Sequence, residues 1–356
     1  MRVKLEDVCV RGTSNLKQSD VIDKTGEYPI YGAAGYIGSV DFYHQDQPYV
    51  AVVKDGAGIG RTSLHPAKSS VIGTMQYLLP KENILPEYLC YVVCYMHLEK
   101  YFTGATIPHI YFKDYKNEAF NLDTLDRQRE MVDILVKTEG IIALRQKELQ
   151  KLDDLIKARF VEMFGSIHES TEYPYVAVKD LTDVISGGTP SRDKSEYWED
   201  GTIPWVKTTE LQNNIIVNVD EYITEAGLNG SSAKLVPAGT VLVAMYGQGK
   251  TRGMTAYLNI EACTNQACAC ILPSDRIDSM FMWKFFELSY EKLRSLAQGA
   301  GQPNLNGNII KNFQVLVPPI ELQKEYVDFV RQADKLKLLS LILCIHIPYF
   351  CSKCYD

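Results

Sequence analysis

Apolar residues recur every seven positions through a long segment in the middle of the chain. From Asp123 to Phe164 the sequence contains no proline, and charged residues lie mostly on the other faces. The recurring residues are Leu135, Ile142, Leu149, Ile156 and Met163. This period predicts a coiled-coil seam on a helix of about 60 Å. The alternative, an amphipathic helix lying on one globular domain, is less favoured because so long a seam needs a second helix of similar length.

Short apolar segments alternate with glycine-rich loops on both sides of this helix. Two predicted strands and an aromatic-rich helix occur before it and again after it: Tyr49–Lys54, Val71–Leu79 and Pro86–Phe102, then Thr240–Tyr246, Ala267–Leu272 and Asp278–Gln298. Each set ends in a polar loop and one more predicted strand: Glu118–Leu122 and Phe313–Val317. The strands are too short and irregular for a doubly wound parallel sheet, so the pattern predicts an α+β fold.

The two sides also resemble each other in sequence. The spacing that separates Pro108 from Pro303 also separates Gln128 from Gln323. Similarly, "VAVVKDGAGIGRT" from Val50 resembles "VLVAMYGQGKTRG" further along the chain. We therefore expect a duplicated domain; the alternative is chance similarity between generic strand-loop-strand segments.

The duplication predicts four parts. Residues 1–121 and 167–317 form the two copies, residues 122–166 form the central spacer helix, and residues 318–356 form a distal spacer helix. Two copies that are each followed by a long helix assemble most economically if the helices pair as an antiparallel coiled coil, which relates the copies by a pseudo-two-fold axis. A two-headed arrangement of this kind suits a protein that reads two separated half-sites on DNA.

Composition narrows the class of protein. The 356 residues carry a formal charge of −7, so any basic surface must be local or come from a partner. Nine cysteines without a disulfide-like spacing, and no signal peptide, indicate the cytoplasm. The apolar run from Leu338 to Phe350 is too short and too interrupted to span a membrane.

No motif predicts catalysis or a resident metal. "GQGKT" from Gly247 lacks the first glycine of a phosphate-binding loop, because that position is Ala244. "CSKC" at Cys351 has zinc-like spacing but no second pair of ligands. We therefore expect a non-catalytic recognition subunit with no cofactor and no metal.

Several motifs resemble one known family. "ISGGTPSRDKSEYWEDGTIPWVKTTEL" (Ile185 to Leu211) and "GAGQPNLN" followed by "VLVPPIELQKEYVDFV" resemble target-recognition domains in the specificity subunits of type I restriction-modification enzymes. The first copy is less similar, since "NLDTLDRQ" stands where the second copy has "LVPPIELQ". The resemblance implies two recognition domains on double-stranded DNA, two methyltransferase subunits and restriction subunits. S-adenosylmethionine, ATP and Mg would then belong to those partners, which carry out DNA methylation and cleavage.

Polar residues in the loops after the strands are the candidates for DNA contact, because Gln and Asn pair with adenine and Arg or Lys with guanine or phosphate. The candidates are Lys54, Arg61, Thr106, His109, Lys207, Thr208, Tyr246, Gln248, Lys250, Arg252, Gln302, Asn304 and Asn306. The alternative is that these turns only cap strands and that the basic residues are solvated surface. Thr189 and Trp205 are interpreted as structural.

The end of the chain departs from the repeat. "LKLLSLILCIHIPYFCSKCYD" replaces the charged pattern of the central helix, which suggests an out-of-frame end and a shortened distal helix. A silent or defective recognition cassette is therefore one alternative function. A non-catalytic scaffold that binds protein or glycan is another.

Overall fold

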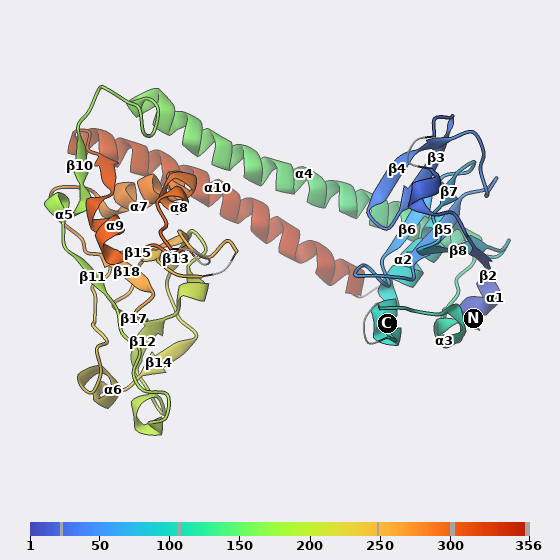
Figure 1. Ribbon diagram of the computed structural model, residues 1–356, viewed down its shortest axis with the longest axis horizontal. Helices are drawn as coiled ribbons and strands as arrows, with labels where there is room; N and C mark the ends of the chain where they lie inside the picture. Colours follow the sequence, from blue (N-terminus) through green and yellow to red (C-terminus); the bar gives the residue numbers. More distant parts are fainter. Residues whose placement is uncertain (22–23, 105–107, 248, 300–302, 353–356) are drawn as a thin grey trace. The chain divides into compact units, whose positions relative to one another are not determined.

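The computed structural model describes residues 1–21, 24–104, 108–247, 249–299 and 303–352, with side chains as far as residue 340. The chain divides into two compact units, Met1–Ala143 and Leu144–Asp356 (Figure 1). Each unit has its own sheets and its own hydrophobic core.

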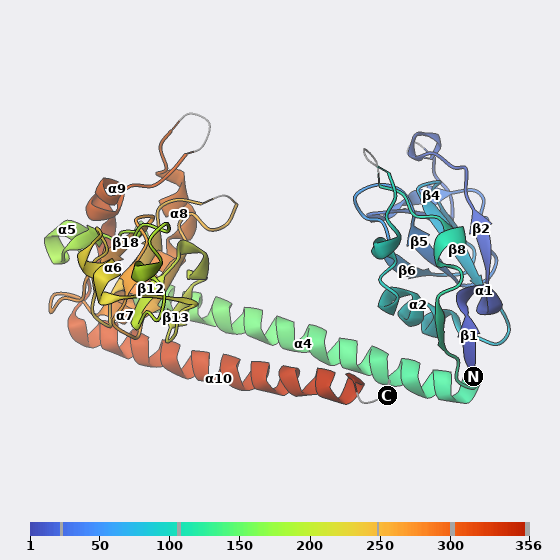
Figure 2. The same cartoon turned by 90° about the horizontal axis from the view of Figure 1, so that it is seen from below.

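The first unit contains three small sheets. An antiparallel pair joins β1 (Arg2–Lys4) to β9 (Ala119–Asn121). The four-stranded sheet has the order β2 (Cys9–Thr13), β8 (Met75–Pro80), β5 (Tyr49–Val53) and β6 (Thr62–His65), and the three-stranded sheet has the order β4 (Gly35–Val40), β3 (Tyr28–Gly32) and β7 (Ser70–Val71). The helices are α1 (Leu5–Val8), α2 (Pro86–Tyr95) and α3 (Phe112–Tyr115), with 3-10 turns η1 (Gln18–Asp20) and η2 (Leu98–Tyr101). Helix α2 packs on β5 and β6 (Figure 2).

The second unit repeats this plan with one added strand. Its antiparallel pair joins β10 (Tyr175–Ala177) to β19 (Gln314–Leu316). The larger sheet has the order β11 (Val184–Ser186), β18 (Cys268–Ile271), β15 (Val241–Ala244), β16 (Thr255–Leu258) and β13 (Asn214–Ile216), and the smaller has the order β14 (Glu221–Ile223), β12 (Ile203–Val206) and β17 (Cys263–Thr264). The short helices are α5 (Val178–Leu181), α6 (Glu225–Asn229), α7 (Ser279–Leu288), α8 (Tyr290–Ser295) and α9 (Gly307–Asn312), with 3-10 turns η3 (Ser195–Tyr197) and η4 (Thr208–Glu210).

Strand pairing confirms the duplicated α+β fold. Val3 pairs with Phe120 in the first unit, and Val176 pairs with Val315 in the second, each at the centre of an antiparallel strand pair. In both units a four-residue helix follows the first strand of this pair, α1 after β1 and α5 after β10. In both units the central strand of the smaller sheet pairs parallel with the strand that comes last in the chain: β3 with β7 and β12 with β17. Only β13, which runs parallel to β16, has no counterpart in the described part of the first unit.

Three predicted elements are wrong in their continuity. The aromatic-rich helix of each copy is split: α2 ends at Tyr95, before His97 adopts a left-handed conformation (φ 50°), and α7 ends at Leu288, before Ser289 joins it to α8. The predicted strand Val71–Leu79 is also two strands in different sheets. A turn in which the Met75 amide donates to the Ile72 carbonyl (3.0 Å) separates them.

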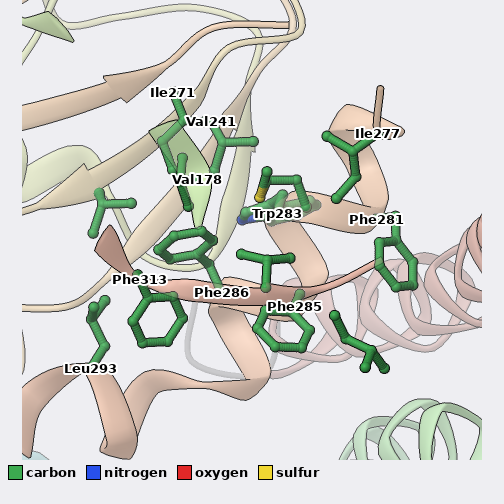
Figure 3. Packing of buried hydrophobic residues seen from close by; sticks show 14 of the residues in the cluster. Val178, Val241, Ile271, Ile277, Phe281, Trp283, Phe285, Phe286, Leu293 and Phe313 are labelled. Carbon is green, nitrogen blue, oxygen red and sulfur yellow. The ribbon is translucent and has the colours of Figure 1, made fainter. Parts of the chain in front are cut away.

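The core of the second unit is built around α7. Phe281, Phe285 and Phe286 are fully buried and belong to one cluster with strand residues such as Val241 and Ile271 (Figure 3). Each such side chain contributes about 1.5–3 kcal/mol when it is removed from water. Figure 1 shows α7 beside α10 (Ile320–Ser352), so this core also covers one face of that helix.

The long central helix is confirmed, and it runs unbroken as α4 (Leu125–Phe164). Within the second unit its last part lies antiparallel to α10: Arg159 pairs with Glu325 (2.8 Å), and Asp153 pairs with Lys337 (2.6 Å). Tyr326 donates to the carbonyl of Ile156 (3.4 Å).

The predicted seam is unevenly covered. Ile156 is only 5% exposed and joins the core of the second unit, whereas Ile142 is 36% exposed. Leu135, Leu149 and Met163 are half-buried. Helix α10 begins directly after Pro318–Pro319, since proline is well suited to the start of a helix, and continues through Pro348 to Ser352.

The described helices include none that is both long enough and apolar enough to cross a membrane. Among the same residues, no group of three or more His, Cys, Asp or Glu side chains is arranged to hold a metal ion. The "CSKC" segment lies beyond the described side chains.

Candidate nucleic-acid interface

Two loops lie together in the second unit, and both carry residues that we predicted to contact DNA. One connects β15 to β16, and the other is closed by two hydrogen bonds of 2.9 Å between the backbones of Gln298 and Asn304. The loops are joined because the Leu305 amide donates to the Met245 carbonyl (3.0 Å) and the Arg252 guanidinium donates to the Pro303 carbonyl. The residues brought together are Tyr246, Lys250, Arg252 and Asn304.

The first unit contains the same pair of loops. The backbones of Thr103 and His109 exchange hydrogen bonds of 2.9 and 2.8 Å, and the Ile110 amide donates to the Lys54 carbonyl (3.0 Å). The imidazole of His109 also contacts the Asp55 carboxylate (2.7 Å). The structure thus places Lys54 beside His109, and Arg61 ends the same β5–β6 loop.

Glycine allows both loops to turn at the same point. Gly56 and Gly247 occupy corresponding positions after β5 and β15, and both have positive φ, 93° and 138° respectively. Other residues rarely adopt this conformation.

The candidate residues differ in how freely they reach solvent. Arg61 and Lys250 are exposed, and Tyr246 is 41% exposed. The ammonium of Lys54 lies 3.9 Å from the Asp55 carboxylate. Three candidates lie outside the described residues: Thr106, Gln248 and Gln302.

Lys207 and Thr208 lie after β12, in the smaller sheet. The Lys207 ammonium is 3.0 Å from Glu221 and 3.4 Å from Asp220, and its hydrogen bond to Glu221 raises its pKa. Burial raises the pKa of Glu221, but hydrogen bonds from Arg192 and Lys207 outweigh burial, so that pKa is lowered. Lys207 is therefore already neutralised by carboxylates. Thr208 accepts a long hydrogen bond of 3.5 Å from Asn265.

Asn306, predicted as a DNA contact, caps a helix through its side chain. Its side-chain oxygen accepts hydrogen bonds of 3.0 Å from the amides of Asn308 and Ile309, which makes it the N-cap of α9. The interpretation of Trp205 as structural agrees with its burial (2% exposed) and with its hydrogen bond to the Gly188 carbonyl (3.0 Å). Thr189 donates to the Gln266 side chain.

The residues that hold the loops were not among the predicted site residues. Asp55 contacts His109 in the first unit, and Tyr290 and Arg294 bond the backbone of the β15–β16 loop in the second. The only sequence signal for Tyr290 and Arg294 was their spacing of four, which places them on one face of a helix.

Two α+β units, each presenting polar side chains from a pair of joined loops and each containing part or all of a long helix, define a duplicated recognition protein. A family model described as "Type I restriction modification DNA specificity domain" matches residues 1–154 and 171–341. The chain belongs to this family.

Named relatives agree with this assignment. The chain is 26% identical over 153 residues to the type I restriction enzyme EcoR124I/EcoR124II specificity subunit of Escherichia coli, which covers 42% of this chain and 38% of the relative. It is 24% identical over 316 residues to the MjaVIII specificity subunit of Methanocaldococcus jannaschii, covering 81% of this chain and 72% of the relative. The chain therefore spans little more than a third of the length of the first of these relatives.

Solved structures share the fold. The S subunit of a type I restriction-modification system from M. genitalium superimposes with a TM-score of 0.58 at 13% identity, covering 99% of this chain and 94% of that one. A chain from a structural study of complex assembly in a type I restriction-modification system gives the same TM-score at 16% identity, covering 98% and 95%.

Proposed function

We propose that this chain is the DNA-specificity subunit of a type I restriction-modification system. It reads a target of two short half-sites and directs methyltransferase and restriction subunits to it, and it performs no chemistry itself. The observation that carries this proposal is the loop pair that is built twice, once in each unit, by the same backbone hydrogen bonds. Membership of the DNA specificity domain family supports it.

The proposal assigns each part of the chain a role. Residues 1–121 and 167–317 would each read one half-site, and residues 122–166 and 318–356 would set the distance between the half-sites. Exposed Arg61 and Lys250 suit phosphate or guanine, and Tyr246 offers a hydroxyl. Since the chain carries a net charge of −7, the partner subunits would supply further phosphate contacts. S-adenosylmethionine, ATP and Mg would be bound by those partners.

A methylome tests the proposal. The chain is expressed with the methyltransferase subunit encoded beside it, in a bacterium without DNA methylation, and modified adenines are mapped by single-molecule sequencing. We expect a split motif with two short halves and a gap of fixed length. An unmethylated genome, in cells where the two subunits are shown to be folded and bound to each other, would contradict the proposed function.

A further inference from the structure

Helix α8 holds the β15–β16 loop by its backbone. The Tyr290 hydroxyl donates to the carbonyl of Lys250 (2.7 Å), and the Arg294 guanidinium donates to the carbonyl of Arg252 (2.7 Å) and to the Tyr290 hydroxyl (3.1 Å). Tyr290 and Arg294 are four residues apart, so both project from one face of the helix. The loop is therefore fixed at two alternate residues by one rigid element.

The hydrogen bonds continue from this loop to the second one. The Arg252 guanidinium donates to the carbonyl of Pro303, next to Asn304. One chain of hydrogen bonds therefore runs from α8 through Arg252 to Pro303. The bonds that reach the two loops end on backbone carbonyls, and the side chains of Tyr246 and Lys250 are exposed to solvent.

Packing at Gly253 adds to this arrangement. Gly253 has a φ of 85°, and a Cβ placed on it would lie 3.1 Å from Cγ of Arg294 and 3.5 Å from the Tyr290 ring. The loop thus rests directly on the two α8 side chains. A larger residue would have to displace them.

The first unit differs at one of these two positions. Positions 95 and 99 correspond to 290 and 294 at the spacing of the repeat, and they hold Tyr95 and Glu99. A carboxylate cannot donate to a carbonyl as Arg294 does. There the two loops are joined by the side chains of His109 and Asp55 instead. A change at Arg294 therefore removes hydrogen bonds that Glu99 cannot make in the first unit.

We propose that Tyr290 and Arg294 are positioning residues for DNA reading by the second unit: they set the place of its two loops without touching DNA. This inference rests on the proposed function. Base readout depends on donors and acceptors held to within about 0.5 Å, so releasing the loops would lower discrimination between bases. Because the two residues make no phosphate contact, the salt dependence of binding would stay as in the wild type.

The test compares methylomes of four variants. Arg294→Met removes the donors but keeps a long side chain, Tyr290→Phe removes only the hydroxyl, and Arg294→Lys restores a donor. Lys292→Met is the matched control, since Lys292 is an exposed residue of the same helix. Thermal unfolding, and binding of a duplex carrying the wild-type motif across a salt series, are measured on the same complexes.

We expect Arg294→Met and Tyr290→Phe to leave one half-site intact and to make the other degenerate, with discrimination there lowered at least roughly fivefold, about the size of one lost base contact. Arg294→Lys should restore much of the discrimination at that half-site, and Lys292→Met should give the wild-type motif. Equal degeneracy in both half-sites, or an unchanged motif, would overturn the inference. So would a salt slope that falls by about one, the mark of a direct phosphate contact. Failure of the wild type to give any split motif would instead overturn the proposed function.

Discussion

The side-chain oxygen of Gln323 accepts a hydrogen bond from the backbone amide of Asp278 at 2.9 Å, across 45 residues of sequence. Asp278 is the N-cap of α7, and the Gln323 amide group donates to the carbonyl of Pro318 just before α10 (2.7 Å). Gln323 is 1% exposed. One buried side chain thus fastens the start of the aromatic helix to the start of the long helix.

Gln128 makes the matching contacts in the first unit. Its oxygen accepts from the amide of Leu85, the N-cap of α2 (2.9 Å), and its amide group donates to the carbonyls of Asp123 (2.9 Å) and Asn83 (3.0 Å). It is fully buried. The duplication therefore extends from sequence and topology to individual hydrogen bonds.

Replacing Gln323 with alanine should lower the free energy of unfolding by about 1–3 kcal/mol. The change leaves the Asp278 amide and the Pro318 carbonyl without their partner in a dry site, and unpaired buried polar groups cost about that much. Urea denaturation followed by circular dichroism measures the loss. Gln146→Ala, at an exposed position on α4, is the control. A loss no larger than that of the control would show that the contact does not stabilise the unit.

The repeat in the sequence predicted the topology well because it carried the turn residues along with the apolar ones. Gly56 and Gly247, for example, fall at the same bend after a buried strand. The breaks within the aromatic-rich helices could not be predicted, since apolar residues continue through both of them. The left-handed conformation of His97 leaves no mark in the local sequence.

The candidate site was predicted less completely. Sequence identifies which loops are polar, but not which polar groups are already paired. Lys207, for example, pairs with Glu221 on another strand and with Asp220 just before that strand. The cap formed by Asn306 had a usable signal, an Asn directly before a short amphipathic segment. The bonds of Arg294 to the β15–β16 loop depend on packing and had no such signal.

The pairing of α4 with α10 should weaken at high pH through Lys337. Burial lowers the pKa of Lys337, but hydrogen bonds to Asp153 and Asp334 outweigh burial and raise it. A folded-state pKa above the unfolded value of about 10.4 means that the charged lysine stabilises the fold fully below that pH. The stabilisation is lost as pH rises through the folded-state pKa.

We therefore expect Lys337→Met to reduce the free energy of unfolding at pH about 8, and the difference from the wild type to shrink by pH about 11. Urea denaturation at the two pH values measures this difference. Lys151→Met, at an exposed position on α4, should show no such trend. A difference between wild type and Lys337→Met that grows with pH would refute the assignment.

Asn306 should act as a helix cap and not as a base contact. Asn306→Ala should lower the free energy of unfolding by about 1 kcal/mol. Asn306→Ser should retain most of this stability, because a serine hydroxyl can also accept a hydrogen bond from the backbone amides in the first turn of α9. The serine lacks the amide that pairs with adenine. Binding of the duplex that carries the methylated motif should therefore be the same for Asn306→Ser and wild type. A clear loss of affinity in the serine variant would restore Asn306 as a DNA contact.

Lys250 and Lys207 should differ in their contribution to DNA binding. Lys250 is exposed and its ammonium makes no ion pair within the described residues, whereas the Lys207 ammonium is held by Glu221 and Asp220. Each phosphate that a lysine neutralises releases about one counterion, so it adds about one to the slope of log affinity against log salt. We expect Lys250→Ala to lower this slope by about one and Lys207→Met to leave it unchanged, as measured by fluorescence anisotropy of the labelled duplex. The reverse pattern would mean that DNA displaces the two carboxylates from Lys207, and that the smaller sheet takes part in binding.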